Sequence, residues 1–252
     1  MAESTFYALV YAWVGLGVVV FPLLLKIPAP YGRHTRPGWG MTVPNHLGWL
    51  IMELPALLVF VYFFLVGTVS QTAATWFFFV LWVVHYSNRS FVFPFRLKTA
   101  QKRMPVVIMS MAFIFNVVNG FICGHYFGSF APRYSSAWFA DPRFLAGVVL
   151  FFSGLGLNWY SDHVLIGLRS SEPSQYSIPD GGIFRYVSCP NFLGEIIEWG
   201  GFALLTWSIP TLAFFVWTLA NLIPRALDHH RWYKEQFDDY PPSRKALIPF
   251  LI

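Results

Sequence analysis

Charged and phenolic side chains lie inside long apolar stretches of this sequence, where lipid would oppose them. Glu53 lies in one such stretch, two residues before Pro55, which bends a helix and frees a backbone carbonyl. Tyr86 ends another stretch, and Arg89 follows three residues later, so a phenol and a guanidinium are about one helical turn apart. Because ionisable groups at membrane depth must be paired or line a polar cavity, these three residues are candidates for a functional site. An interfacial carboxylate and a Tyr–Arg belt at the membrane surface are the alternatives.

A second set of polar residues is concentrated in about the last hundred positions, at the ends of apolar runs. Asn158 and Asp162 are four residues apart on one helical face, an arrangement that is also typical of a helix end. Glu195 and Glu198 lie three residues apart inside a later apolar run, where they need cationic partners. This distribution suits a large, anionic, water-soluble cosubstrate, although the sequence has no GxGxxG or Walker motif.

The composition places the whole chain in a membrane. Of its 252 residues, 56% are hydrophobic, 20% are aromatic and only 12% are charged, whereas soluble domains have about 25% charged residues. So few charges cannot cover a water-soluble surface. We therefore expect an all-α integral membrane protein.

Seven apolar runs approach the length of about 20 residues that a helix needs to cross a bilayer. They lie at residues 6–25, 47–69, 73–86, 104–122, 144–160, 192–207 and 209–223. If all seven cross, 15 of the 17 Lys and Arg residues fall on one side, with only Arg133 and Arg143 opposite. The positive-inside rule then predicts seven transmembrane helices, an outside or lumenal N-terminus and a cytosolic C-terminus.

The basic balance does not indicate a nucleic-acid partner. The net charge is +5, but the basic residues lie in short loops beside the apolar runs and form no basic domain. Membrane lipid, or an anionic ligand on the cytosolic side, is the better partner. We expect one membrane domain covering residues 1–252, a monomer and, with two cysteines, no metal site.

Several short blocks, in order along the chain, resemble the steroid 5α-reductase family, the 3-oxo-5α-steroid 4-dehydrogenases. The resemblance runs from about Tyr31 to the last residue. The blocks are Tyr31-Gly32-Arg33-His34-Thr35, Glu53-Leu54-Pro55, His85-Tyr86 with Arg89, Asn158 with Ser161-Asp162, Ile178-Pro179 with Gly181-Gly182, residues 191–199, and residues 239–250.

The resemblance implies NADPH-dependent reduction of the 4,5 double bond of 3-oxo-4-ene steroids, such as testosterone and progesterone. Hydride would reach the β-carbon of the enone, and a proton would then reach the α-carbon. The Tyr86 phenol would act as the electrophile at the ketone oxygen, with Glu53 orienting it and Arg89 stabilising the enolate or shaping the pocket. Donors aimed at developing charge in a dry site contribute about 3 to 4 kcal/mol each.

Carried over residue by residue, the resemblance also implies a cofactor site and a substrate pocket. Amides and carboxylates suit the nicotinamide and ribose groups of NADPH, and arginine and histidine suit its phosphates. The implied cofactor residues are Asn158, Asp162, Arg169, Tyr176, Asn191, Glu195, Arg225, His229, Tyr233 and Lys102. Phe115 and Trp199 would line the substrate pocket. Residues from 1 to about 125 would contribute mainly the substrate pocket, and residues from about 140 to 252 the NADPH site.

Two other classes of function stay open at this point. One is a related membrane enzyme that acts on polyprenol, enoyl-CoA or isoprenylcysteine, the last of which would use S-adenosylmethionine. The other is a transporter or a seven-helix receptor, in which the buried charges would form an ion path or a switch. The membrane would be the inner membrane in a bacterium and the endoplasmic reticulum in a eukaryote.

Overall fold

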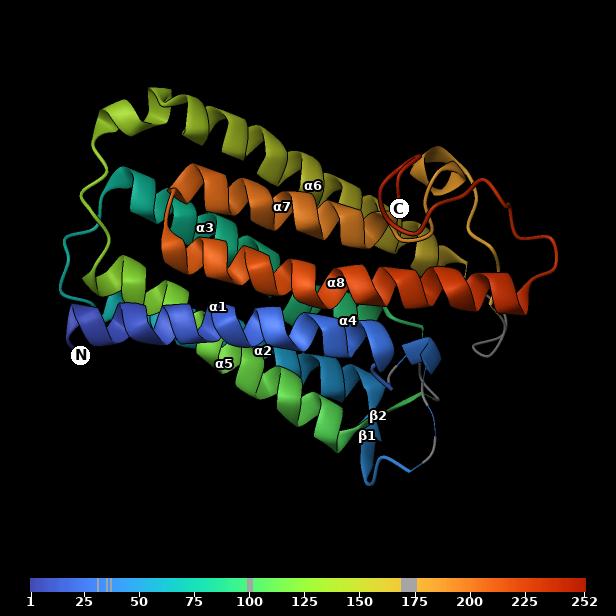
Figure 1. Cartoon of the computed structure of the whole chain (residues 1–252). Coiled ribbons are helices and arrows are strands. Elements are labelled where there is room, and N and C mark those ends of the chain that lie inside the picture. Colours follow the sequence, from blue (N-terminus) through green and yellow to red (C-terminus); the bar gives the residue numbers. More distant parts are fainter. Residues whose placement is uncertain (31, 35, 37, 99–101, 169–175) are drawn as a thin grey trace. The chain divides into compact units, whose positions relative to one another are not determined.

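The computed structural model describes residues 1–30, 32–34, 36, 38–98, 102–168 and 176–252. The chain forms two compact units, Met1–Val10 with Ala29–Leu145 and Tyr11–Pro28 with Ala146–Ile252. Helices make up most of each unit (Figure 1). The expectation of a single domain over residues 1–252 stays a prediction.

Five helices in the described part of the chain are long and apolar enough to cross a membrane. They are α1 (Glu3–Lys26), α2 (Asn45–Leu65), α5 (Val106–Ser129), α6 (Pro142–Gly167) and α8 (Ile209–Gln236). The other two predicted runs form the shorter helices α3 (Ala73–Ser87) and α7 (Pro190–Thr206), of 15 and 17 residues. The helical multi-pass prediction is therefore confirmed, whereas seven crossings and the orientation of the termini stay predictions.

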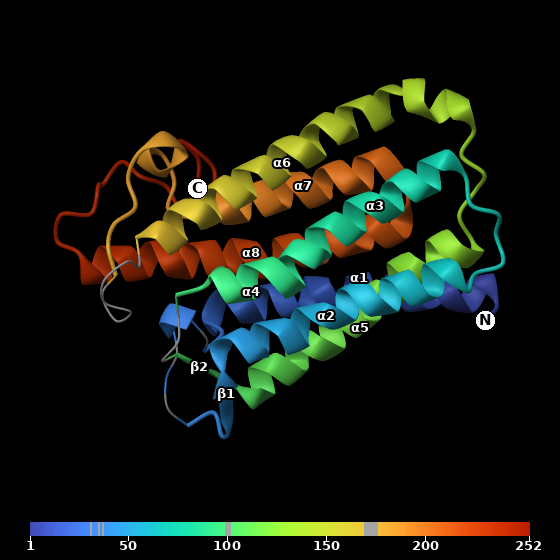
Figure 2. The same ribbon diagram turned by 180° about the vertical axis from the view of Figure 1, so that it is seen from behind.

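In the first unit, α2 and α5 pack with their backbones in close contact (Figure 2). Gly120, Gly124 and Gly128 repeat every four residues along α5 and face α2. A Cβ atom on Gly124 would lie 2.6 Å from the carbonyl oxygen of Phe60. Small residues let two membrane helices approach this closely, and the contact holds the C-terminal half of α2 against α5.

The third predicted run extends beyond its expected end at residue 86. After α3 the chain makes one π-helical turn, η2 (Asn88–Val92), and continues directly into α4 (Phe93–Arg96). The side chain of Trp82 anchors α3 to α2, because its indole nitrogen donates to the carbonyl oxygen of Ala56 at 2.9 Å. Arg89 therefore lies within a continuous helical segment and in its π-helical turn, a feature that is common at functional sites.

A small antiparallel ribbon, which the sequence did not predict, joins the starts of α2 and α5. Strand β1 (Thr42–Pro44) pairs with β2 (Arg103–Pro105), and Arg103 also binds Thr42 through its side chain at 2.7 Å. Pro44 and Pro105 end the strands and are the N-caps of the two helices. The remaining short elements are the 3₁₀ turns η1 (Gly32–His34), η3 (Ser136–Ala140) and η4 (Gly182–Arg185).

In the second unit, α6 and α7 run side by side (Figure 1). Gly147 and Gly154 on α6 meet Gly201 and Gly194 on α7, and a Cβ atom at Gly194 would lie 2.5 Å from the backbone nitrogen of Asn158. The two helices therefore touch backbone to backbone, as membrane helices with paired small residues do. This contact brings the polar ends of both helices together.

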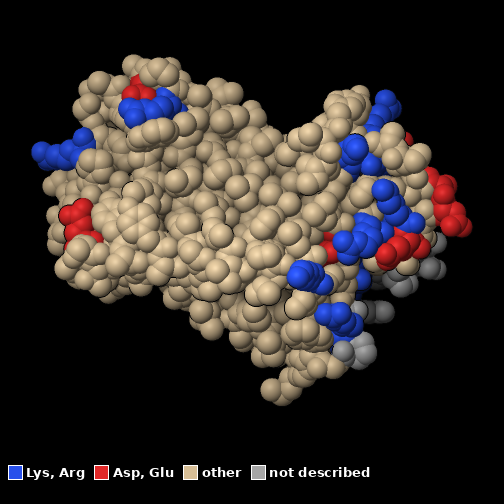
Figure 3. Space-filling model, in the orientation of Figure 1, with Lys and Arg blue, Asp and Glu red and all other residues tan. Residues whose placement is uncertain are grey.

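The apolar outer surfaces of the helices support the membrane assignment. On α5, Met111 and Ile114 are 63% and 61% exposed, and the helix contains no Lys, Arg, Asp or Glu residue. On α8 the charged residues begin only at Arg225, and Figure 3 shows charged side chains gathered beside the C-terminal end of this helix. Apolar surfaces of this extent need lipid to cover them.

Candidate active site

Glu53, which is buried, and Arg89, which is partly buried, form an ion pair in the first unit. Glu53 lies in α2, ahead of Pro55, and Arg89 lies in the π-helical turn, with its Nη2 atom 3.2 Å from Oε1 of Glu53. The guanidinium also lies over the rings of Trp49 and Phe93, at 5.0 and 4.8 Å. A buried carboxylate is tolerated when a cation compensates it, and the two rings fix the position of that cation.

Asn116 completes the surroundings of Glu53 and was not among the predicted site residues. Its amide nitrogen donates to the carbonyl oxygen of Met52 at 2.6 Å and lies 3.5 Å from Oε2 of Glu53. The available sequence signal was an amide inside the apolar run 104–122. That signal does not distinguish Asn116 from Asn119, which is also buried in this run and donates to the carbonyl oxygen of Phe115 in its own helix.

Tyr86 is buried on α3, one turn before Arg89. Its ring contacts those of Trp82 and His85, with centroids 4.9 and 5.0 Å apart. Ser90, beside Arg89, is fully buried, and its hydroxyl has no hydrogen-bond partner among the described residues. The first unit thus provides a phenol, a paired carboxylate and an unused hydroxyl on two helical segments that pack together.

Two further predicted residues also belong to the first unit. Phe115 is half-buried on α5, next to Asn116. Lys102 precedes strand β2, and its carbonyl oxygen accepts a hydrogen bond from the backbone of Asn45 at 3.1 Å. Their proposed contacts with substrate and cofactor stay predictions.

In the second unit, the packing of α6 against α7 assembles a polar cluster of Asn158, Asp162 and Asn191. The amide nitrogen of Asn158 donates to the carbonyl oxygen of Asn191 at 3.0 Å. The amide nitrogen of Asn191 donates to Oδ1 of Asp162 at 3.2 Å. Asn158 and Asp162, which are four residues apart on α6, therefore do more than cap a helix, because both side chains bind Asn191 in the first turn of α7.

This cluster keeps unused hydrogen-bonding capacity. Asn158 is 1% exposed, and its side-chain oxygen has no partner among the described residues. The hydroxyl of Ser161, which is fully buried on the same helix, also lacks one in the described part of the chain. Buried polar atoms without partners carry a free-energy penalty of about 1 to 3 kcal/mol, so a ligand that binds them is favoured.

The predicted carboxylates of α7 differ in their surroundings. Glu195 is half-buried, one turn after Asn191, and Glu198 is fully buried. Trp199 is 1% exposed and packs edge-on against Phe214 at 4.6 Å, with Phe151 and Phe202 nearby. Trp199 is thus part of an aromatic core, and its contact with a substrate stays a prediction.

The last turns of α8 carry the predicted phosphate-binding residues. Arg225 and His229 are four residues apart on this helix, and His229 contacts the ring of Phe192 at 5.4 Å. Tyr233 is buried and stacks on Tyr240, with centroids 5.3 Å apart. Tyr176 contacts the ring of Trp232. Arg169 lies outside the described residues.

The loop before α7 is held by the C-terminal segment, which the sequence did not reveal as a structural element. The hydroxyl of Ser188 bonds to Nδ1 of His230 at 2.6 Å, to the Tyr240 hydroxyl at 2.7 Å and to the carbonyl oxygen of Lys245 at 3.0 Å. Arg244 is buried and donates to the carbonyl oxygen of Pro179 at 2.9 Å. Burial raises the pKa of Tyr240, against the opposing effects of Ser188 and Arg244, so its phenol stays protonated.

The double glycine in this loop has the backbone conformation that its residue type permits. Gly181 and Gly182 have φ angles of +88° and +51°. A Cβ atom on Gly182 would also lie 3.1 Å from the Tyr160 hydroxyl. The two glycines let the chain turn closely past α6 into the segment that leads to Asn191.

The fold and composition define a helical multi-pass membrane protein, and its two units each contain a cluster of buried polar side chains. A family model described as 3-oxo-5-alpha-steroid 4-dehydrogenase matches residues 102–252. A relative from Bos taurus named 3-oxo-5-alpha-steroid 4-dehydrogenase 1 is 41% identical over 97% of this chain and 96% of its own length. A steroid 5-alpha-reductase of Gossypium hirsutum is 40% identical over 96% of each chain. The Homo sapiens 3-oxo-5-alpha-steroid 4-dehydrogenase 1 is 37% identical over 99% of this chain and 96% of its own.

This chain therefore belongs to the 3-oxo-5-alpha-steroid 4-dehydrogenase family and is an oxidoreductase. The resemblance that the sequence blocks carry is confirmed. Membership of this family argues against the transporter, receptor and methyltransferase alternatives.

Proposed function

We propose that this protein reduces the 4,5 double bond of 3-oxo-4-ene steroids to 5α-dihydro products, with NADPH as the reductant. Relatives that share about 40% of its residues over nearly their whole length carry the names of this activity. The observation that carries the proposal for the site is the ion pair of the buried Glu53 with Arg89, supported by Asn116 and lying inside the apolar helix α2. A neutral, apolar substrate does not need an ion pair for binding, so we infer a chemical role for this one.

The residues of the first unit activate the ketone in this proposal. The Tyr86 phenol donates a hydrogen bond to the ketone oxygen, which accumulates negative charge as the β-carbon is reduced. Glu53 is held by Arg89 and Asn116 and orients the polar groups around that oxygen. The guanidinium of Arg89 offsets the charge of the enolate, after which a proton reaches the α-carbon.

The polar cluster of the second unit fits the cofactor. When bound, NADPH supplies the hydride. The unpartnered oxygen of Asn158 can accept a hydrogen bond from the nicotinamide carboxamide, and the nearby hydroxyl of Ser161 can serve the same group or a ribose. Asp162, Asn191 and Glu195 offer acceptors for ribose hydroxyls.

The phosphates need cations and donors at a water-accessible end of the helices. Arg225, His229 and Tyr233 occupy the C-terminal turns of α8, where charged residues are concentrated. We assign Tyr176 and Arg169 to the same part of the cofactor, and Lys102 to the 2′-phosphate. Guanidinium groups match phosphate oxygens in a bidentate geometry.

The membrane arrangement we propose has seven crossings, with the N-terminus outside or in a lumen and the C-terminus in the cytosol. Two features support membrane crossings at α3 and α7, the two helices that are short for a span. The helix α3 continues through η2 into α4 as far as Arg96, and the 17 residues of α7 span about 26 Å at 1.5 Å per residue. We propose a monomer, in the inner membrane of a bacterium or the endoplasmic reticulum of a eukaryote.

The test is NADPH oxidation by the purified protein in detergent, with testosterone or progesterone as substrate and mass spectrometry of the product. Tyr86→Phe should lower kcat by about 100- to 1000-fold, the usual loss when a donor to developing negative charge is removed. Glu53→Gln should also lower kcat, because it removes the carboxylate that pairs with Arg89 and orients the polar groups of the site. Both variants should still bind NADPH, because the cofactor residues are unchanged. Tyr62→Phe is the matched control, since Tyr62 is 59% exposed on the outer face of α2 and should keep full activity.

Two results would count against the proposal. If folded wild-type protein binds NADPH but turns over neither steroid, the substrate assignment is wrong, and polyprenols and enoyl-CoA become the next substrates to test. If Tyr86→Phe retains wild-type kcat, the phenol is not the electrophile.

A further inference from the structure

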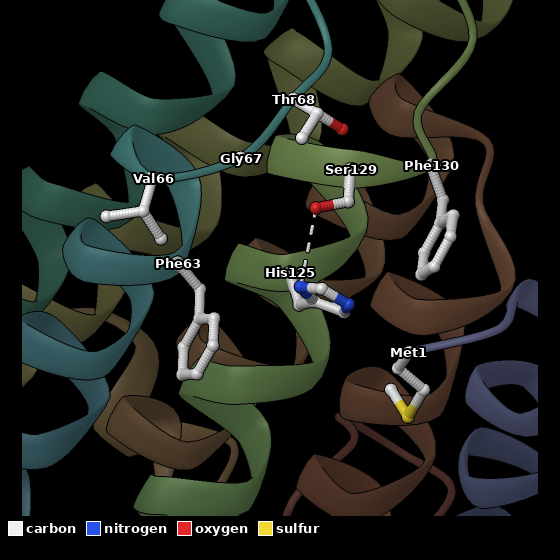
Figure 4. Close-up of a pocket in the computed structure, with 8 residues that line it drawn as sticks. All are labelled: Met1, Phe63, Val66, Gly67, Thr68, His125, Ser129 and Phe130. Atoms are coloured by element: carbon white, nitrogen blue, oxygen red, sulfur yellow. Dashed lines mark hydrogen bonds between the residues drawn. The ribbon is translucent and has the colours of Figure 1, made fainter.

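A pocket of about 310 Å³ lies in the first unit at the end of α2 that is remote from Glu53 (Figure 4). Its lining includes Phe63, Val66, Thr68, His125, Ser129 and Phe130. Val66 caps α2 and follows Glu53 by 13 residues, which corresponds to about 20 Å along a helix. None of the residues assigned above to substrate or cofactor contributes to this lining. The pocket is therefore separate from the candidate active site.

The polar part of the pocket is an imidazole enclosed by aromatic rings. His125 stacks on Phe121 with centroids 5.2 Å apart, and it meets Phe63 and Phe130 edge to face at 5.7 and 5.1 Å. Its Nδ1 atom lies 3.4 Å from the hydroxyl of Ser129. The surrounding rings hold the imidazole in place without satisfying its second nitrogen.

That second nitrogen, Nε2, is buried and has no hydrogen-bond partner among the described residues. Figure 4 shows it turned away from Ser129, toward the side of the pocket where Met1 and Phe130 lie. Whether Nε2 donates or accepts depends on which nitrogen carries the proton. A hydroxyl group can satisfy it in either case, because a hydroxyl both donates and accepts.

The rest of the lining is mostly apolar. The described residues that line the pocket include no Lys, Arg, Asp or Glu side chain, and the charge nearest His125 is the α-amino group of Met1, whose N–H groups can donate to a ligand oxygen. Phe63, Val66 and Phe130 offer apolar contact. The pocket also lies at the ends of α2 and α5, two candidate membrane spans, where a lipid can present its polar end.

We propose that this pocket is a second lipid site, which binds the hydroxyl of a neutral lipid through His125 and Ser129. A sterol and a diacylglycerol share this chemistry, a single hydroxyl on an apolar body. The volume is near the lower limit of small-molecule pockets, so the pocket holds the hydroxyl-bearing end of the lipid while the remainder extends along the helices. The proposal does not depend on the reductase activity.

Photocrosslinking tests the proposal on the full chain in phosphatidylcholine nanodiscs. The probes are a diazirine sterol and a diazirine diacylglycerol, each compared with its deoxy analogue, in which hydrogen replaces the hydroxyl, and peptide mass spectrometry locates the adducts. We expect the free-hydroxyl form of one probe to label residues 63–68 and 125–130, and its deoxy analogue to label them roughly 5- to 10-fold less. Labelling by the sterol alone identifies a sterol site, and labelling by the diacylglycerol alone a glyceride site.

Protein variants give an independent measure. His125→Phe should reduce this labelling to the level of the deoxy analogue, whereas His125→Gln, which keeps a polar group, should retain part of it. Steroid-dependent NADPH oxidation should be unchanged in both, because the pocket is remote from Glu53. Equal labelling by the hydroxyl and deoxy probes, or no adducts at these residues with either lipid, would overturn the proposal even if His125→Phe fails to fold.

Discussion

The close contact of α6 with α7 can be tested with two alanine substitutions on the same helix. A Cβ atom at position 154 would collide with the backbone of α7 at Gly194 O and Glu198 N and lie 2.8 Å from the Glu198 Cα. A Cβ atom at position 156 meets none of the described residues within 4 Å. Gly154→Ala and Gly156→Ala therefore add the same methyl group to one helix, with and without a collision.

The difference between the two variants isolates the cost of that collision. Replacing glycine by alanine inside a helix stabilises it by about 0.5 to 1 kcal/mol, and this gain is common to both. Overpacking a tight contact costs about 1 to 3 kcal/mol. Only Gly154→Ala incurs this cost, because only at position 154 does the added methyl group meet the backbone of another helix. We therefore expect Gly154→Ala to be less stable than Gly156→Ala by about 1 to 3 kcal/mol.

Thermal unfolding in detergent, followed by tryptophan fluorescence, measures this difference, at roughly 2 to 4 °C for each kcal/mol in a chain of this size. A titration with NADPH gives a second readout, since separating α6 from α7 lengthens the 3.0 Å hydrogen bond from Asn158 to Asn191 O. We expect weaker cofactor binding in Gly154→Ala and wild-type binding in Gly156→Ala. Equal melting temperatures and equal affinities in the two variants would refute the backbone contact.

Three further substitutions test the interactions of single side chains. Asn158→Leu keeps a similar size but removes the unpartnered side-chain oxygen. It should weaken NADPH binding by roughly tenfold in a fluorescence titration. An unchanged affinity would remove Asn158 from the cofactor site. Asn116→Leu should lower kcat with NADPH affinity unchanged, because it releases Glu53, and a wild-type kcat would show that the amide does not position the carboxylate. Ser188→Ala should destabilise the fold by about 1 to 3 kcal/mol, since the hydroxyl joins His230 to Tyr240; an unchanged melting temperature would contradict this network.

The sequence by itself was sufficient for the class of fold and the family. Hydrophobic runs of membrane length follow from the thickness of the bilayer, which acts on each segment locally, so they can be recognised without knowing what packs against them. The same local constraint made Glu53 and Arg89 conspicuous, because a charge in an apolar run needs an explanation. The order of the motif blocks then indicated the family that the comparisons confirm.

The partners of those residues were decided by tertiary structure. Asn116 lies 63 residues from Glu53 in sequence, and only the approach of α5 to α2 brings its amide within 3.5 Å of the carboxylate. Likewise, the role of Ser188 depends on a C-terminal segment more than 50 positions away. Neither pairing has a sequence signal, because buried amides and hydroxyls also bond within their own helix, as Asn119 does.

The glycines show most clearly which features can be read from the sequence and which depend on the folded structure. Their spacing along α5, α6 and α7 is visible in the sequence, but a glycine in a membrane helix can face lipid as easily as another helix. Gly154 and Gly156 are two residues apart and chemically identical, yet only Gly154 meets a second backbone. Which face of a helix is turned toward a neighbour depends on the packing of all its contacts together, and that is a property of the folded chain.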